Sequence, residues 1–365
     1  MPEYTLEQLP EQTVGYAGVA RYSNGVFYSV RPVSRGVGKL RWYRVNTPSV
    51  DLTGGVFMDH PKDILHEFPV RKSKKQKISF QEAILSYCQS LGYDGTVEKG
   101  SLGVRNIVIG NPERARYLIT AHYDTCAALP FPNLLTPCNL GLFLAWQFFL
   151  VILLCVPAGI IAGIIGGMSG SPVLGFYLAY LILLLELIWM LFGPANRHNA
   201  NDNTSGVVAV LETAAAIPAD LRDQVCFVLF DLEEAGLFGS SAYRKMHRKA
   251  SSRQLILNLD CVGEGDEILL FPTKKLKNDE DRVAKIVDLC MTDGNKSIVV
   301  KNKGFAIYPS DQVNFPTGFG IAAFCRSKWA GLYLGKIHTK RDKILDEKNI
   351  ALLRDFLIEI VRDQA

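Results

Sequence analysis

The sequence predicts a three-layer α/β domain into which a two-helix hairpin, long enough to cross a membrane, is inserted. Short apolar runs of strand length, at 116–120, 225–230 and 255–259, alternate with segments that have helical spacing. Such alternation along a chain is typical of helices packed on both faces of a sheet. Two long apolar stretches, 139–167 and 172–192, interrupt this pattern and predict the hairpin.

The first part of the chain has a different pattern. Between residues 13 and 46, aromatic or aliphatic side chains mix with polar ones, which indicates a few antiparallel strands. A basic run at 71–77 follows, and it is either a solvated linker or a segment that contacts anionic lipid head groups, where each basic residue contributes about 1 kcal/mol. We expect residues 1–76 to form a small β-rich extension of a domain made of 77–138 and 193–365.

Within that domain the expected elements follow in order. Helical spacing at 80–91 predicts the first helix, and 106–109 begins the sheet pattern. Further helices are expected after Asp202, after Gly239, around 283–290 and at 348–361.

Residues 139–192 are expected to form the membrane hairpin. From 140 to 166 no side chain is charged, and at about 1.5 Å per residue a helix of this length exceeds a hydrocarbon core of roughly 30 Å. The second stretch, 173–192, is about the minimum length for spanning and contains one carboxylate, Glu186. The alternative is a pair of core helices in a soluble protein, but helices that are apolar on all sides are rarely buried in a domain of this size.

A short turn between the two stretches would return the chain to the side of the membrane from which it started. Gly159, Gly163 and Gly167 recur every four residues, and Gly175 and Ala179 offer a matching row of small residues on the second helix. We therefore expect the two helices to pack closely, and the same small-residue faces could join copies of the chain into a homo-oligomer.

Three features favour a multi-pass protein of the cell membrane whose α/β domain faces the cytoplasm. Arg197 follows the second span, whereas the turn between the spans carries no positive charge. The eight cysteines are scattered without a CxxC pair, which suits a reducing compartment. The first residues lack the positive and apolar regions of a secretory signal.

Composition and charge exclude one class of partner. The formal net charge of +4 is too small to argue for nucleic acid, and the chain has no Cys/His finger pattern or arginine-rich helix. About 48% hydrophobic and 21% charged residues are ordinary for a globular protein that carries some membrane sequence.

Acidic and imidazole side chains arrive repeatedly at the ends of predicted strands. His122 and Asp124 follow the strand at 116–120, and Glu233 and Glu234 follow the strand at 225–230. The carboxyl ends of strands in open α/β sheets are where ligands and active sites are placed. Such a histidine can bind zinc while a nearby carboxylate orients it, although an HxD triplet alone is usually incidental.

Two further carboxylates and a second histidine fit the same scheme. Asp260 ends the predicted strand at 255–259, Asp202 lies in a loop that enters a helix, and His338 lies in a late loop. A carboxylate in the position of Asp202 can bridge two cations, or it can be an ordinary helix cap.

These pieces together resemble a known family. The ordered set is AHYDT (121–125), NDNTSG (201–206), DLEEAGLFGS (231–240), LNLD (257–260) and IHTKRD (337–342). It resembles the co-catalytic di-zinc peptidase family that includes bacterial leucyl aminopeptidases, glutamate carboxypeptidase II and glutaminyl cyclases. The resemblance implies an αβα aminopeptidase-like domain with a mixed central sheet.

The resemblance also implies the role of each residue. One Zn²⁺ would be held by His122 and Asp260 and the other by Glu234 and His338, with Asp202 bridging both. Glu233 would be the general base, and Asp124 would orient His122. Because this set contains no thiolate, Co²⁺ or Mn²⁺ could also occupy the site.

The chain departs from the family in two places, both at the rim of the expected site. The hairpin stands between His122 and Asp202 where the family commonly has a short loop, and Gln312 replaces a histidine in the Ser310-Asp311-Gln312 segment. Substrate preference therefore stays open, and for binding the substrate amine or oxyanion Tyr308 and Asp311 are only loop candidates.

The leading functional hypothesis is a membrane-anchored zinc aminopeptidase that trims short or hydrophobic peptides. One alternative is an amidohydrolase that removes acyl or aminoacyl groups from lipid-like substrates, because the hairpin is rooted beside the expected ligands. Others are glutaminyl cyclisation and a non-catalytic membrane scaffold that keeps the peptidase fold.

Overall fold

The computed structural model describes residues 19–21, 27–32, 40–44 and 58–363, and the chain divides into two compact units, Met1–Asp59 and His60–Ala365. In the first unit the described segments are β1 (Val19–Arg21), β2 (Phe27–Pro32) and β3 (Leu40–Arg44). They pair antiparallel in the order β1-β2-β3, as the pattern between residues 13 and 46 predicts. The rest of the first 57 residues lies outside the described ones.

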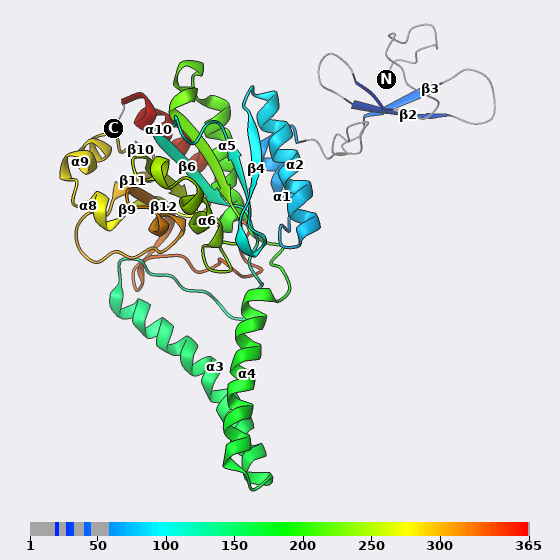
Figure 1. The fold of residues 1–365 in the computed structure, drawn as a ribbon, viewed down its shortest axis with the longest axis vertical. Coiled ribbons are helices and arrows are strands. Elements are labelled where there is room, and N and C mark those ends of the chain that lie inside the picture. Colours follow the sequence, from blue (N-terminus) through cyan, green and yellow to red (C-terminus); the bar gives the residue numbers. More distant parts are fainter. Residues whose placement is uncertain (1–18, 22–26, 33–39, 45–57, 364–365) are drawn as a thin grey trace. The chain divides into compact units, whose positions relative to one another are not determined.

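The second unit is built on a mixed sheet (Figure 1). Among the described residues the strand order is β10-β11-β9-β12-β8-β6-β7-β5-β4, with β13 paired to β12. The strands are β4 (Gly95–Lys99), β5 (Arg105–Ile109), β6 (Tyr117–His122), β7 (Val225–Phe230), β8 (Leu255–Leu259), β9 (Glu267–Pro272), β10 (Thr292–Asp293), β11 (Lys296–Val300), β12 (Gly318–Ser327) and β13 (Gly331–Tyr333). The predicted α/β fold with a mixed central sheet is confirmed.

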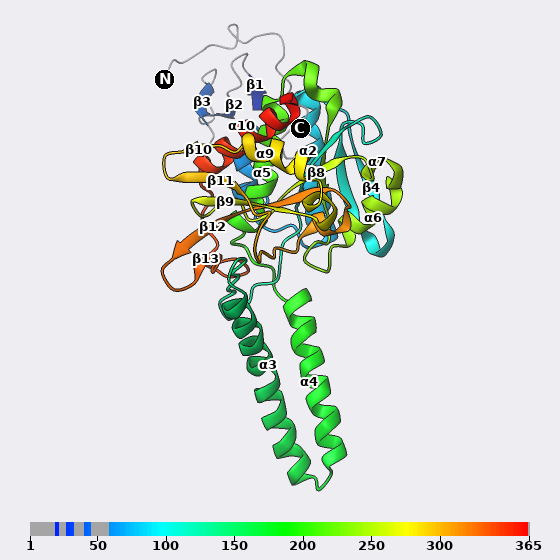
Figure 2. The same cartoon turned by 90° about the vertical axis from the view of Figure 1, so that its left-hand side faces the viewer.

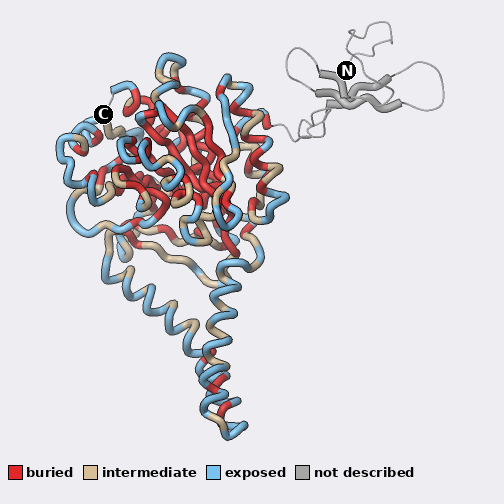
Figure 3. Tube along the Cα trace, viewed as in Figure 1, coloured by how far each residue is buried: buried red, intermediate tan, exposed pale blue. Residues whose placement is uncertain are grey.

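The centre of the sheet is a parallel block. Strand β6 pairs parallel with β7 and β8, and β8 pairs parallel with β12. Every residue of β6, β7 and β8 is buried, as expected for strands covered on both faces. Figure 3 shows this buried core in the middle of the unit. Because these strands run in the same direction, their carboxyl ends lie at one edge of the sheet.

Helices cover both faces of the sheet (Figure 1). The longer ones are α2 (Lys74–Ser90), α5 (Gly206–Ala216), α6 (Phe238–Met246), α9 (Glu280–Asp288) and α10 (Glu347–Asp363). Short α-helical turns are α1 (Ile64–Glu67), α7 (Arg248–Ser251) and α8 (Lys274–Lys277). Shorter helical segments of other types are Pro61–Asp63, Ser101–Gly103, Ala200–Ser205, Ala219–Gln224 and Asp311–Asn314. The helices expected after Asp202, after Gly239 and at 283–290 and 348–361 are all present.

The basic run at 71–77 is not a solvated linker, and that interpretation was wrong. Ser73 caps α2, and its capping box with Gln76 starts the helix six residues before the expected start. Arg71 is fully buried and Lys77 is 6% exposed. Burial of these two cations depends on partners distant in sequence, whereas residues 73–76 between them are exposed. The expected boundary at residue 76 falls within α2.

The two long apolar helices are α3 (Leu140–Met168) and α4 (Pro172–Phe192). They extend away from the α/β part (Figure 2), and only a few of their residues are buried (Figure 3). Both are long and apolar enough to cross a membrane.

The two helices meet at their turn and separate toward the α/β part (Figure 1). The close contact is made by Ala162 and Gly166 against Gly175, where a Cβ added to Gly175 would lie 2.9 Å from the Ala162 carbonyl oxygen. The expected row of Gly159, Gly163 and Gly167 faces open space instead. The helices do pack together, but through the row one residue away from the predicted one.

Both ends of the hairpin are tied to the α/β part by backbone and side-chain contacts. The segment before α3 and the segment after α4 pair through a bridge between Ala127 and Ala195. Leu135 pairs with Leu334, and the Lys72 ammonium donates hydrogen bonds to the carbonyls of Leu191 and Gly193 at the end of α4. The hairpin is therefore rooted in the loops at the carboxyl edge of the sheet.

Candidate metal centre

The carboxyl edge of the parallel block brings together the residues that the strands deliver. His122 is the last residue of β6, Glu233 and Glu234 follow β7, and Asp260 follows β8. Since β6 lies between β7 and β8, these side chains converge from adjacent strands. Asp202 and His338 reach the same place from loops.

Asp202 lies between the two histidines. Its Oδ1 is 3.3 Å from Nε2 of His122, and its Oδ2 is 2.9 Å from Nε2 of His338. Nε2 of His122 is also 3.6 Å from Oδ1 of Asp260, and Nε2 of His338 is 3.5 Å from Oε2 of Glu234. The five residues proposed as metal ligands therefore form two groups that share Asp202.

The loop that carries Asp202 is held in place by hydrogen bonds to Asp342. Backbone N–H groups of Asn201 and Asp202 donate to the two carboxylate oxygens of Asp342, at 2.7 and 2.9 Å. The Asn203 side chain accepts a hydrogen bond from the Gly206 N–H, which begins the next helix. A Cβ on Gly206 would lie 2.5 Å from the Leu259 carbonyl oxygen, so the motif requires glycine at this close approach.

Asp124 contacts both His122 and the glutamate pair. Its Oδ1 lies 3.5 Å from Nδ1 of His122, on the ring side opposite Asp202. Its carboxylate also accepts the backbone N–H groups of Glu233 and Glu234, at 3.1 and 3.3 Å. Asp124 therefore lies where it can orient the histidine, and its hydrogen bonds hold the turn that presents both glutamates.

Glu233 and Glu234 are the most exposed carboxylates near the two histidines, at 15% and 13% of their side-chain surface. Oε2 of Glu233 lies 4.0 Å from Nε2 of His122, and the Asp202 side chain is by contrast 4% exposed. Burial raises the pKa of Glu233 well above the usual range, and the neighbouring carboxylates of Glu234 and Asp260 add to this effect although His122 opposes it. A raised pKa suits a group that takes up a proton during a reaction.

The cluster of carboxylates and unpaired polar atoms is a suitable environment for a cation. Among the described residues, neither ring nitrogen of His122 makes a hydrogen bond of ordinary geometry, and Oε1 of Glu234 also has no partner. Buried polar atoms without partners are costly, and carboxylates crowd this space from several elements. Imidazole nitrogens and carboxylate oxygens at these separations are a donor set that fits divalent metal ions.

The protonation of the metal-free cluster predicts how its stability depends on pH. Burial raises the pKa of Glu234 to about 8 and that of Asp342 to about 7. Burial opposes protonation of His338, but the Glu234 and Asp202 carboxylates outweigh it and raise that pKa to about 10. From about pH 6 to about pH 9 the folded state therefore binds more protons than the unfolded chain, so the stability of the metal-free protein should fall as the pH rises.

Metal ions replace these protons, so the rise in Tm on adding Zn²⁺ should be larger at about pH 8 than at about pH 6. Thermal unfolding of the detergent-solubilised protein, with and without Zn²⁺ at each pH, measures this difference. An increment in Tm that is equal at the two pH values, or larger at the lower one, would contradict the proposed cluster.

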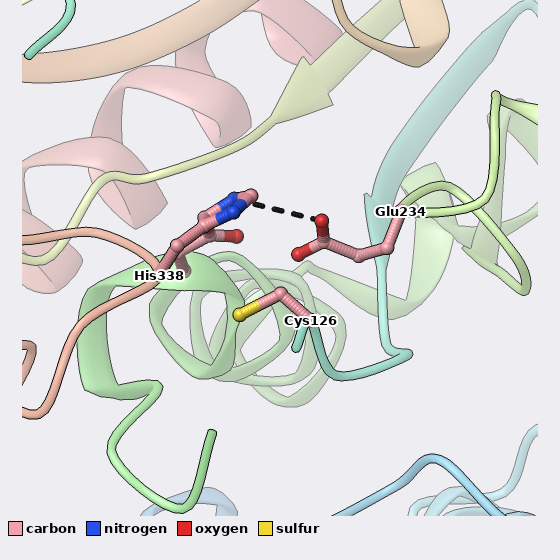
Figure 4. A group of neighbouring side chains, drawn as sticks. Cys126, Glu234 and His338 are labelled. Atoms are coloured by element: carbon pink, nitrogen blue, oxygen red, sulfur yellow. Dashed lines mark ion pairs between the residues drawn. The ribbon is translucent and has the colours of Figure 1, made fainter. Parts of the chain in front are cut away.

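One side chain in the cluster was not expected. Cys126 comes four residues after His122, is 2% exposed, and lies with Asp202, Glu234 and His338 in a group whose ligand atoms are all within 4.8 Å of one another. Figure 4 shows its sulfur directed toward the space between Glu234 and His338. The signal in the sequence was its place in the loop right after the first histidine, whereas the ligand set that the resemblance implies contains no thiolate.

Arg71 is a second residue that the sequence pattern did not reveal. Its guanidinium donates to the carbonyls of Tyr123 and Phe68 and to the Thr204 hydroxyl, and its backbone N–H donates to Thr125. These bonds join the segment around Asp124 to the segment around Asp202. Arg71 therefore supports both halves of the site that the hairpin separates in sequence.

In the rim segment at 308–312, every residue except Pro309 is buried. Tyr308 donates to the backbone carbonyl of Asp260, and the Gln312 amide donates to the Tyr308 carbonyl and accepts from Asn258. Gln312 thus fills a structural position. Asp311 is fully buried, and burial raises its pKa to about 7.

The fold is an α/β domain, and at the carboxyl edge of its sheet Asp202 lies between two groups that each contain a histidine and a carboxylate. This combination is typical of metallopeptidases. Residues 190–357 match the family model of peptidase family M28, and this match confirms the family resemblance of the motifs. The matched segment includes Asp202, Glu233, Glu234, Asp260 and His338. His122 and Asp124 precede it, and the fold brings them to the same place.

Solved structures with the same fold include the LapA aminopeptidase of Legionella pneumophila, with 13% identity, a TM-score of 0.52, and coverage of 84% of this chain and 71% of that one. The glutaminyl cyclase of Porphyromonas gingivalis has 16% identity, a TM-score of 0.51, and coverage of 84% and 98%. At these identities the likeness shows the fold alone. No curated protein matches the chain. The findings support a metallopeptidase.

Proposed function

We propose that this protein is a membrane-anchored, zinc-dependent aminopeptidase that hydrolyses the first peptide bond of short or hydrophobic peptides. The observation that carries the proposal is the position of Asp202, whose two carboxylate oxygens face the two histidines. A carboxylate in this position can bind two metal ions at once. Enzymes with paired metal ions use them to hydrolyse amide bonds.

The chain offers ligands for two Zn²⁺ ions. His122 and Asp260 would hold one ion, Glu234 and His338 the other, and Asp202 both. When bound, zinc supplies Lewis-acid polarisation of the scissile carbonyl and lowers the pKa of water.

Proton transfer falls to Glu233. Its carboxylate lies 4.0 Å from His122, and its backbone N–H donates a hydrogen bond to Asp124, which fixes its place relative to that histidine. Glu233 would accept the proton of the attacking water and deliver it to the leaving amine.

Helices α3 and α4 would be the membrane anchor. Their exposed apolar surface has no partner within the described part of the chain, and a lipid bilayer is the environment that fits it. Because both ends of the hairpin join loops of the site, the two portions of the catalytic domain lie on the same side of the bilayer, which we place in the cytoplasm. The open row of Gly159, Gly163 and Gly167 could receive a second copy of the chain.

A second candidate is hydrolysis of an acyl or aminoacyl amide on a lipid-like substrate. It is favoured by the attachment of the hairpin to the site, where the Asn196 N–H after α4 donates to the carbonyl of Cys126. A substrate that stays in the bilayer would then meet the cluster at the membrane surface.

The test is a substrate panel on the full-length, zinc-loaded protein in lipid nanodiscs. Aminoacyl anilides and short peptides with a free amine should be cleaved, and the same compounds with an acetylated amine should not. Cleavage of N-acyl amino acids or aminoacylated lipids alone would favour the second candidate. Cyclisation of amino-terminal glutaminyl peptides without hydrolysis would point to a cyclase, and silence on every substrate by a metal-loaded protein would overturn the proposal of an enzyme.

A further inference from the structure

A thiol stands inside the proposed metal centre. Cys126 comes from the loop between β6 and the hairpin, and its side chain points into the cluster with Glu234 and His338 (Figure 4). It is 2% exposed, so solvent does not compete with the cluster for its sulfur. Three of its neighbours in this group are residues that the proposed function already assigns to one ion.

The distances suit one ion with four ligands. Sγ of Cys126, one ring nitrogen of His338 and one carboxylate oxygen each of Asp202 and Glu234 lie within 4.8 Å of one another. In a tetrahedral zinc site with Zn–S near 2.3 Å and Zn–N or Zn–O near 2.0–2.2 Å, ligand atoms are about 3.5 Å apart. The four atoms therefore need to move inward by only a small distance to enclose an ion.

The two halves of the centre differ in whether they contain a thiol. The group of His122, Asp202 and Asp260 contains no sulfur. Cys261 follows Asp260, but its thiol donates a hydrogen bond to Asp260 Oδ1 at 3.1 Å and is not in a ligand group among the described residues. Only the half that contains Glu234 and His338 thus offers a soft ligand.

The backbone around Cys126 is held on both sides. Its carbonyl accepts the Asn196 N–H at 2.9 Å, and the Leu129 N–H donates to the His338 carbonyl at 2.8 Å. The bridge between Ala127 and Ala195 lies between these two bonds. Cys126 therefore lies in the backbone segment 126–129, which is hydrogen-bonded both to the segment after α4 and to the His338 loop.

We propose that Cys126 is the fourth protein ligand of the ion held by Asp202, Glu234 and His338. This inference rests on the proposed function, because it assumes that the centre binds two ions. The thiol gives its proton to solvent as the metal–sulfur bond forms. Thiolates select zinc over manganese and magnesium, so this half of the centre discriminates between metals although the other half does not.

The ligand count also separates the two ions by role. Four protein ligands complete a tetrahedral zinc site, whereas catalytic zinc sites keep one position open. The ion beside Glu233, held by His122, Asp260 and Asp202, is then the one that keeps a position open.

Zinc X-ray absorption spectroscopy of the full-length, zinc-loaded protein tests the proposal without any substitution. With two zinc ions per chain, the expected spectrum shows on average half a sulfur per zinc at about 2.3 Å. A spectrum fitted by nitrogen and oxygen alone, at a stoichiometry of two, would overturn the ligand while leaving the proposed function standing. A chain that takes up no zinc would overturn both.

Cobalt loading adds a test with matched variants. The Co²⁺ protein should show a thiolate-to-cobalt charge-transfer band in the near ultraviolet. Cys126→Ser should lose the band, and Cys290→Ser should keep it, because Cys290 is a partly buried cysteine after α9 whose thiol donates to a helix carbonyl. A band that persists in Cys126→Ser would contradict the assignment.

Competition between zinc and manganese for the centre measures how much Cys126 contributes to zinc affinity. Loss of an outer-shell partner commonly costs roughly 10- to 100-fold in metal affinity, and loss of a ligand should cost at least as much. Cys126→Ser should therefore weaken zinc binding at one of the two positions by at least about tenfold while manganese binding stays the same. An unchanged zinc-to-manganese preference would count against the proposal.

Discussion

Replacing Glu233 by glutamine should lower kcat for peptide hydrolysis by about 10²- to 10⁴-fold while two metal ions stay bound. Glutamine keeps the size of the side chain and the backbone contact with Asp124 but cannot accept a proton. The metal ligands His122 and Asp202 are untouched by the change. Steady-state kinetics and metal content measured on the same sample would show whether loss of hydrolysis is separate from loss of metal.

A matched control for this variant is Glu98→Gln. The Glu98 side chain is 19% exposed, close to the 15% of Glu233, and it bonds to His247 rather than to the metal cluster. It should keep the parent's kcat. If Glu233→Gln also kept the parent's kcat, Glu233 would not be the general base.

Replacing Asp202 by asparagine should remove both metal ions and abolish hydrolysis. Among the described residues, Asp202 is the carboxylate that lies within 4.0 Å of both histidines, and the neutral amide leaves each ion with one carboxylate fewer. Asp260→Asn is the informative comparison because, of the two histidines, Asp260 contacts only His122. That variant should keep the ion at Glu234 and His338.

Native mass spectrometry, which measures the number of metal ions bound to each folded chain, distinguishes the two variants. The expected stoichiometry is two ions for the parent, one for Asp260→Asn and fewer than one for Asp202→Asn. Equal loss in both variants, or two ions retained in Asp202→Asn, would show that Asp202 does not join the two halves of the centre.

The part of the site that lies at strand ends could be predicted from the sequence. His122, Glu233 and Asp260 each follow a short apolar run, and the parallel arrangement of β6, β7 and β8 brings such positions to one edge. Asp202 and His338 lie in loops, where local pattern says little, and their assignment depended on the family resemblance. The structure places both beside the strand-end residues.

Residues whose role depends on long-range contacts could not be predicted. Arg71 looked like part of a charged linker because its partners Tyr123 and Thr204 lie far along the chain, on both sides of the hairpin. Cys126 could not be assigned to the site from the sequence because only the folded loop sets it beside His338 and Glu234. The contacting row of the hairpin was misjudged for the same kind of reason, since neighbouring rows of small residues on α3 differ only in which faces α4.

Anomalous diffraction at the zinc edge, from crystals of the zinc-loaded full-length protein, tests the central claim most directly. We expect two peaks about 3.5 to 4 Å apart, with Asp202 between them, one beside His122 and the other beside His338. A single peak away from Asp202, or none at all in a protein that hydrolyses peptides, would contradict the two-ion centre.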